Sequence, residues 1–153
     1  MTLFGNISIS TPEAEIEDLL EGIQASFSED QKKAILASLM RVSDADGDFH
    51  LLEEQLLRLI AGILDYDLRG SRDEIKADLF DIDAGEVLSS LGSFEEEQKD
   101  WYIFTLAALM EADNKVLNEE VEYAKIFLDH MQITNDRFKE VVGNSRTLSG
   151  LFS

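Results

Sequence analysis

Hydrophobic residues recur every three or four positions along most of the chain, and no stretch sustains an alternation of apolar and polar residues. Spacing by three and four places apolar side chains on one face of an α-helix, whereas alternation is typical of a β-strand. The pattern therefore predicts an all-α protein, with helices over about 12–23, 29–42, 52–63, 71–80, 84–91, 94–112 and 118–131 and a last one from about 134. The segment 101–110 is apolar all round apart from Thr105, which is typical of a helix in the centre of a bundle.

The chain also repeats itself. A shift of 67 positions aligns it with itself without a gap. The identical pairs are Ser26-Phe27 with Ser93-Phe94, Glu29 with Glu96, Gln31-Lys32 with Gln98-Lys99, Leu39 with Leu106, Ala45-Asp46 with Ala112-Asp113, and Glu53 with Glu120. We therefore predict one domain over 1–153, a compact bundle of about seven to eight helices built from two pseudo-symmetric repeats, about 13–79 and 80–146.

Two acidic loops occupy equivalent places in the repeats, each after the long helix. Both read acidic-Ala-Asp followed by Gly47 or Asn114, and both have a glutamate seven residues after that aspartate. Glycine and asparagine tolerate positive φ, which turns the chain from one helix toward the next. The apolar residues Phe49 and Val116 follow two positions later, and we expect them to anchor the turns in the core. Such reversals can bring carboxylates together, and the candidate metal ligands are Asp44, Asp46, Asp48, Glu53, Asp113 and Glu120.

The chemistry of these loops favours a hard cation. Converging carboxylates repel one another unless a cation neutralises them, and oxygen-only ligand sets suit Ca²⁺, Mg²⁺ or Mn²⁺. In the second loop Lys115 stands where the first has Asp48, which weakens a second site. An EF-hand starting at Asp44 is excluded, because it would need glycine at Phe49 and glutamate at Gln55. A structural role is the alternative, since Asp beside a turn and Glu in a first helical turn also bond local backbone N–H groups.

Composition narrows the classes of partner. Asp and Glu number 32 against 13 Lys and Arg, and the net charge of −19 repels nucleic-acid phosphates and anionic membrane surfaces. The absence of cysteine excludes disulfides and thiol chemistry. The apolar run 101–110 is too short to span a bilayer, and 1–10 has no secretory signal. We therefore expect a cytoplasmic protein that is not inserted in a membrane and that binds divalent cations or protein partners.

The loop motif carries a family resemblance. A helix-ending Ala-Asp-Gly with a glutamate seven residues after the Asp, repeated after a long central helix, resembles the TerB-like domain of tellurite-resistance proteins. The resemblance covers about 29–133. It implies an all-helical fold, an acidic divalent-cation site and action through protein partners, often beside membrane-associated stress complexes. The family's acidic signature falls on Asp46, Glu53, Asp113 and Glu120, and this chain departs from it at Asn114 and Lys115.

Three functional hypotheses follow from these patterns. The first is a TerB-like module that binds a divalent cation and protein partners in tellurite or stress resistance. The second is a metal-independent acidic scaffold. The third is a metal-dependent hydrolase with two oxygen-ligand sites about 4 Å apart. Because the chain lacks a nucleophile elbow, a phosphate-binding glycine loop and zinc-ligand spacing, we expect no catalytic or organic-cofactor residues. The hydrolase ranks last because the Glu-x-x-His pattern of ferritin-like metal sites is also absent.

Overall fold

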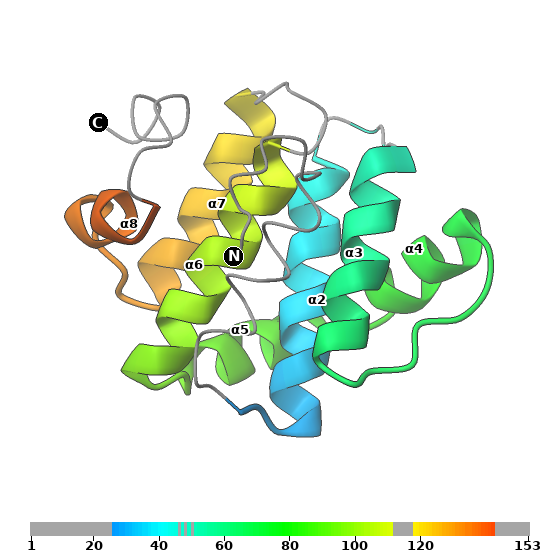
Figure 1. The fold of residues 1–153 in the computed structure, drawn as a ribbon, viewed down its shortest axis with the longest axis horizontal. Coiled ribbons are helices and arrows are strands. Elements are labelled where there is room, and N and C mark those ends of the chain that lie inside the picture. Colours follow the sequence, from blue (N-terminus) through cyan, green and yellow to red (C-terminus); the bar gives the residue numbers. More distant parts are fainter. Residues whose placement is uncertain (1–25, 46, 48, 50, 112–117, 143–153) are drawn as a thin grey trace, which may run out of the picture.

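The computed structural model describes residues 26–45, 47, 49, 51–111 and 118–142, and within them the chain is all helical (Figure 1). Seven helices lie in this part, and it contains no strand: α2 (Glu29–Ser43), α3 (Leu51–Ile63), α4 (Arg72–Phe80), α5 (Ala84–Gly92), α6 (Glu96–Glu111), α7 (Asn118–His130) and α8 (Asn135–Val142). The all-α prediction is confirmed, and each helix expected in these residues begins and ends within two residues of its predicted bounds. The helix predicted over 12–23 lies outside the described residues.

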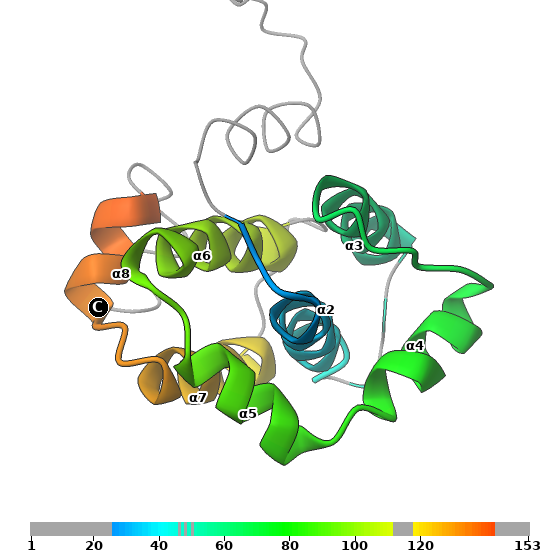
Figure 2. The same cartoon turned by 90° about the horizontal axis from the view of Figure 1, so that it is seen from below.

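Helix α2 is the central element. It contacts α3, α4, α5, α6 and α7, and Figure 2 shows these helices arranged around it. Every side chain from Ala34 to Ser43 is buried, including the polar Ser38 and Arg41. Helix α6 was expected to be central, and its segment 101–110 is indeed buried except for the partly exposed Phe104 and Ala108. The bundle therefore has two largely buried long helices.

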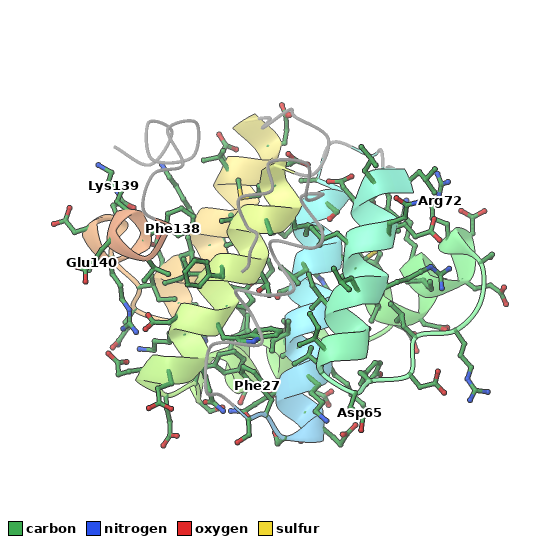
Figure 3. The ribbon with its side chains drawn as sticks, in the orientation of Figure 1. Phe27, Asp65, Arg72, Phe138, Lys139 and Glu140 are labelled. Carbon is green, nitrogen blue, oxygen red and sulfur yellow. The ribbon has the colours of Figure 1, made fainter. Side chains whose placement is uncertain are left out.

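Local sequence signals explain where helices begin. Ser28 accepts a hydrogen bond from the backbone N–H of Gln31, whose side chain accepts one from the Ser28 N–H, and this reciprocal capping box starts α2. Ser71 and Glu74 start α4 in the same way. Such caps satisfy backbone donors that a helix N-terminus would otherwise leave unpaired. In α8, Phe138 is buried whereas Glu140 is exposed, and Figure 3 labels both residues.

The two halves contact each other through equivalent residues. The bounds of α3 and α7 are 67 positions apart, as are the first residues of α2 and α6. Gln31 hydrogen-bonds with Gln98, its counterpart, and the rings of Phe27 and Phe94, another counterpart pair, have centroids 5.5 Å apart. Equivalent residues touch each other only near an axis that relates the two halves. Because the repeats 13–79 and 80–146 include residues outside the described part, the duplication as a whole stays a prediction.

Candidate functional site

The first acidic loop joins α2 to α3, and it begins with a turn that is closed by backbone hydrogen bonds. Asp44 caps the C-terminus of α2, where its N–H donates to the carbonyl of Met40 at 3.0 Å. The Asp44 carbonyl accepts from the N–H of Gly47 at 2.9 Å, and Gly47 has a φ of +83°. The predicted positive φ at Gly47 is therefore confirmed, and so is the burial of Phe49, which is 5% exposed. Asn114 and Val116, their counterparts, lie outside the described residues.

The glutamates that follow the two loops are buried. Glu53 is 1% exposed in the first turn of α3, and Glu120 is 2% exposed in the first turn of α7. The sequence predicts the helical position of both residues, but nothing in its pattern reveals their burial. A buried carboxylate must be compensated by hydrogen bonds or by a cation, because the protein interior solvates charge poorly. Glu53 and Glu120 are therefore the two least solvent-exposed of the candidate ligands that the structure describes.

The helix ends that flank the two acidic loops lie at the same end of the bundle. In Figure 1 the C-terminal ends of α2 and α6 and the N-terminal ends of α3 and α7 all lie at the upper end of the bundle. Glu53 and Glu120 occupy the first turns of α3 and α7, so both belong to this end. The carboxylate-bearing turns of the two halves are thus gathered at one end, away from the Phe27–Phe94 contact at the start of α2 and α6.

Asp44 has an unpredicted partner in α4. Its Oδ1 atom lies 2.9 Å from the Nζ atom of Lys76, and the Asp44 side chain is only 13% exposed. The two groups form an ion pair, so this carboxylate oxygen already has a cationic partner. The neighbouring Ser43 hydroxyl is buried without a hydrogen-bond partner. A hydroxyl oxygen is a donor of the kind that a hard cation accepts.

Glu54, by contrast, is fully engaged in linking α3 to α4. Its two carboxylate oxygens accept hydrogen bonds of 2.9 Å from Arg58 and Arg72. Burial acts to raise the pKa of Glu54, but the hydrogen bonds and charges of the two arginines outweigh it and hold the pKa below its ordinary value of 4.5. Arg58 also donates to the carbonyl of Gly70 at 2.7 Å. Glu54 is therefore a structural anchor rather than a cation ligand.

The structure describes three of the six predicted ligands. Asp44, Glu53 and Glu120 are placed as above, whereas Asp46, Asp48 and Asp113 lie outside the described residues. Among the residues that are described, no three His, Asp or Glu side chains come close enough together to hold a metal ion. The predicted metal centre therefore stays a prediction. In the same part of the chain, no helix has the length and apolar character needed to cross a membrane.

The described residues define an all-helical domain whose first inter-helix loop is framed by buried oxygen donors. Residues 8–74 of the chain match the family model of the tellurite resistance protein TerB, and this confirms the predicted TerB resemblance for that segment. The matched segment includes α2, the first acidic loop and α3, whereas the second loop follows it. No curated protein and no solved structure matches the chain.

Proposed function

We propose that this protein is a TerB-like helical module, and not an enzyme, that binds a divalent cation at the loop between α2 and α3. It acts through protein partners in resistance to tellurite or a related stress, in the cytoplasm and beside membrane-associated complexes. The observation that carries the cation site is the burial of Glu53, which is 1% exposed directly after a loop rich in aspartate. The TerB match to this same segment supports the wider role.

The donor set decides which ion such a site takes. Asp44, Asp46, Asp48 and Glu53 offer only oxygen atoms, and the chain has no cysteine. Oxygen-only sets favour Ca²⁺, Mg²⁺ or Mn²⁺ over softer metals. The net charge of −19 concentrates cations at the protein surface and favours basic partner surfaces. In the second half, Glu120 supplies an equally buried carboxylate, but Lys115 opposes a second ion.

Calorimetric titration of chelator-stripped protein tests the proposal. Wild type, Asp46→Asn and Glu53→Gln are titrated separately with CaCl₂, MgCl₂ and MnCl₂. Both substitutions preserve side-chain size and remove one charge, so we expect saturable binding by the wild type and its loss in either variant. Glu97→Gln is the matched control, because Glu97 is an exposed glutamate in the first turn of α6, and it should bind as the wild type does.

Binding that survives both Asp46→Asn and Glu53→Gln would show that the ion sits elsewhere. No binding by the wild type or by any variant would remove the cation from the proposal. A bound ion also stabilises the fold, by about 2.7 kcal/mol at a hundred times the Kd. A rise in Tm with the same cation, absent in Glu53→Gln, therefore provides an independent measure.

One observation favours the metal-independent scaffold as the second candidate. Asp44 pairs with Lys76, and Glu54 pairs with Arg58 and Arg72, so carboxylates at this end already hold helices together. In a scaffold, the remaining negative charge would attract a basic partner without any metal. Partner binding that weakens with salt but is unchanged by a chelator distinguishes the scaffold from the cation-dependent module.

A further inference from the structure

Helix α5 covers one side of the bundle, and the opposite side has no equivalent of it among the described residues. Helix α5 contacts α2 and α7, whereas no described helix lies across α6 and α3 on the opposite side (Figure 2). The repeat relates α2 to α6 and α3 to α7, because the first residues of each pair are 67 positions apart. An axis that exchanges the two halves therefore predicts a further helix over α6 and α3, in the place that α5 has on α2 and α7.

Helix α5 runs antiparallel to α2. Just before α5 begins, the carbonyl of Ile82 accepts a hydrogen bond of 2.7 Å from Arg41, near the end of α2. Just after α5 ends, the hydroxyl of Ser93 accepts one of 3.4 Å from Gln31, near the start of α2. A helix in the equivalent place should therefore run antiparallel to α6 and end near Gln98, the counterpart of Gln31.

Two residues of α2 differ in exposure from their counterparts on α6. Ala37 and Arg41 of α2 are 0% and 9% exposed. Their counterparts, Phe104 and Ala108, are apolar and yet partly exposed, although the rest of the segment 101–110 is buried. Removal of apolar surface from water is favourable, so this part of α6 is suited to contact with another apolar surface.

Helix α3 extends this partly exposed apolar surface. In α7, the Nε2 atom of His130 lies 3.3 Å from the position that a Cβ on Gly92 of α5 would occupy, so this histidine lies against α5. The counterpart of His130 in α3 is Ile63, which is partly exposed. Ile63, Phe104 and Ala108 all pack against the hydrophobic core, and together they are called the open face here.

The chain that precedes α2 is anchored on α6. Gln98 donates a hydrogen bond of 2.7 Å to the carbonyl of Ser26, the first described residue. This contact repeats the one between Gln31 and Ser93, with the two halves exchanged. Three residues back from Ser26 span at most about 10 Å, and a helix over 16–23 would be about 12 Å long. The α6 part of the open face is about 9–15 Å along the helix from Gln98, so the segment 16–23 can reach it.

The segment 16–23, which lies outside the described residues, has the apolar pattern of α5. The matching apolar positions are Leu19, Leu20 and Ile23 in the segment, and Val87, Leu88 and Leu91 in α5. They are 68 positions apart, so the connection to the next helix is one residue longer in the first half. Val87 and Leu91 are the buried residues of α5. The segment also falls within residues 8–74, which match the TerB family model together with α2 and α3.

We propose that residues 16–23 form a helix that docks on the open face, antiparallel to α6, as α5 docks on α2. The inference is independent of the proposed cation site. Leu19 and Ile23 then occupy the places that Val87 and Leu91 have in the other half, and the acidic residues of the segment remain in solvent. An eight-residue helix is marginal on its own in water, so its contact with the open face supplies the stability that it needs.

Hydrogen exchange by the full chain, followed by mass spectrometry, tests the docking. Amides in 16–23 should exchange at least about tenfold more slowly than in an unstructured peptide, and Leu19→Ser should abolish this protection. Glu21→Ser is the matched control. Leucine and glutamate have similar helix propensities, so both substitutions weaken the helix equally, but the α5 residue equivalent to Glu21 is the exposed Ser89. Leu19→Ser should also lower the Tm by about 4 °C or more, and Glu21→Ser by clearly less.

A cross-linking experiment locates the segment and does not depend on Leu19→Ser folding. The chain has no cysteine, so a pair introduced as Ile16→Cys and Ala108→Cys reacts alone with a short bismaleimide. Ile16 is equivalent to Ala84 at the start of α5, and Ala108 is the counterpart of Arg41, so the pair should cross-link within one chain. Ile16→Cys with Ser89→Cys is the control, because α5 lies on the opposite side of the bundle from the open face (Figure 2).

The outcomes distinguish the possible occupants of the open face. Protection that Leu19→Ser removes and Glu21→Ser retains, together with an intramolecular cross-link between positions 16 and 108, supports the docking. Unprotected amides in wild-type 16–23 overturn it. A cross-link that joins two chains also overturns it, because a second copy then supplies the segment. Equal cross-linking at position 89 would show that the segment is not held on α6, with the same result.

Discussion

The buried hydrogen bond between α6 and α2 permits a quantitative prediction. Tyr102 is 0% exposed, and its hydroxyl donates to Oγ of Ser38 at 2.8 Å. Ser38, also 0% exposed, donates in turn to the carbonyl of Ile35 at 2.9 Å. The perturbation is a double-mutant cycle of Tyr102→Phe and Ser38→Ala, because the two single substitutions remove different partners and leave different groups behind.

The expected magnitudes follow from what each substitution leaves unpaired. In Tyr102→Phe, Ser38 keeps its bond to Ile35, so only one hydrogen bond is lost, at a cost of about 0.5–1.5 kcal/mol in the free energy of unfolding. In Ser38→Ala, the Tyr102 hydroxyl is buried without an acceptor, at a cost of about 1–3 kcal/mol. The higher helix propensity of alanine offsets about 0.5 kcal/mol of that cost. In the double variant no donor is left unpaired, so the costs should fall short of additivity by about 1 kcal/mol.

Equilibrium unfolding in urea, followed by circular dichroism at 222 nm, measures all four proteins. Equal m-values would establish that the substitutions change stability rather than the surface exposed on unfolding. The reasoning is falsified if Tyr102→Phe costs the same in the wild-type and Ser38→Ala backgrounds, since the two side chains would then be uncoupled.

The burial of Tyr102 also predicts how the stability of the protein changes at high pH. Burial raises the pKa of Tyr102 above its ordinary value of 10.0, and the hydrogen bond to Ser38 only partly opposes this. The unfolded chain therefore releases the phenolic proton above about pH 10 while the folded protein retains it. The stability that Tyr102 contributes is fully present below pH 10 and is lost as pH rises toward the folded pKa. Tyr102→Phe should consequently lose less stability than the wild type between pH 9 and 11, as measured by urea unfolding.

Three further predictions concern α3 and its connection to α4. Glu54→Gln should cost about 1 kcal/mol at pH 7, because ion pairs whose arginine partners remain open to solvent contribute up to about that much. The difference from wild type should vanish as pH falls below 4.5 through the lowered pKa of Glu54. Thermal unfolding at pH 7 and pH 3 checks this; an equal cost at both values would contradict it. Gly70→Ala should cost about 1–2 kcal/mol, because Gly70 has a φ of +101° and an added Cβ would lie 3.0 Å from the Cβ of Glu74. Gly62→Ala in α3, where an added Cβ meets nothing within 4 Å, should instead stabilise by about 0.5–1 kcal/mol, and a destabilised Gly62→Ala would show that the contrast has another cause.

The positions of the helices could be predicted from the sequence because the features that determine them are local. Ser28 and Ser71 form capping boxes that mark where α2 and α4 begin, and the spacing of apolar residues indicates how long each helix is. The positive φ of Gly47 and the burial of Phe49 were predictable for the same reason, since both depend on neighbours along the chain.

The centrality of α2 was less visible in the sequence. Ser38, Arg41 and Ser43 interrupt its apolar pattern, yet all three are buried because neighbouring helices surround α2. Arg41 is accommodated by hydrogen bonds to the carbonyls of Ala37 and Ile82 and by the ring of Phe80. Contacts between residues far apart in sequence decide such burial, and periodicity contains no information about them.

The candidate site also combines features that the sequence predicts with features that only the structure shows. The acidic signature and its family resemblance come from the sequence, and the match to residues 8–74 confirms the resemblance for that segment, which contains the first acidic loop but not the second. The burial of Glu53 and Glu120 and the pairing of Asp44 with Lys76 depend on how helices pack, so only the structure reveals them. The repeat pattern does not identify Lys76, because Lys33, Arg41 and Arg69 also lack a basic counterpart 67 positions later.

The common direction of the helix ends has an electrostatic consequence. A helix presents about half a negative charge at its C-terminus and about half a positive charge at its N-terminus. Two C-termini, of α2 and α6, and two N-termini, of α3 and α7, lie at the upper end of the bundle in Figure 1. The dipoles of these four helices oppose one another there, so their termini add little net charge to this end of the bundle. The potential that an approaching ion meets therefore depends mainly on charged side chains, the carboxylates together with basic partners such as Lys76 and Arg72, and single substitutions can change it without altering the helices.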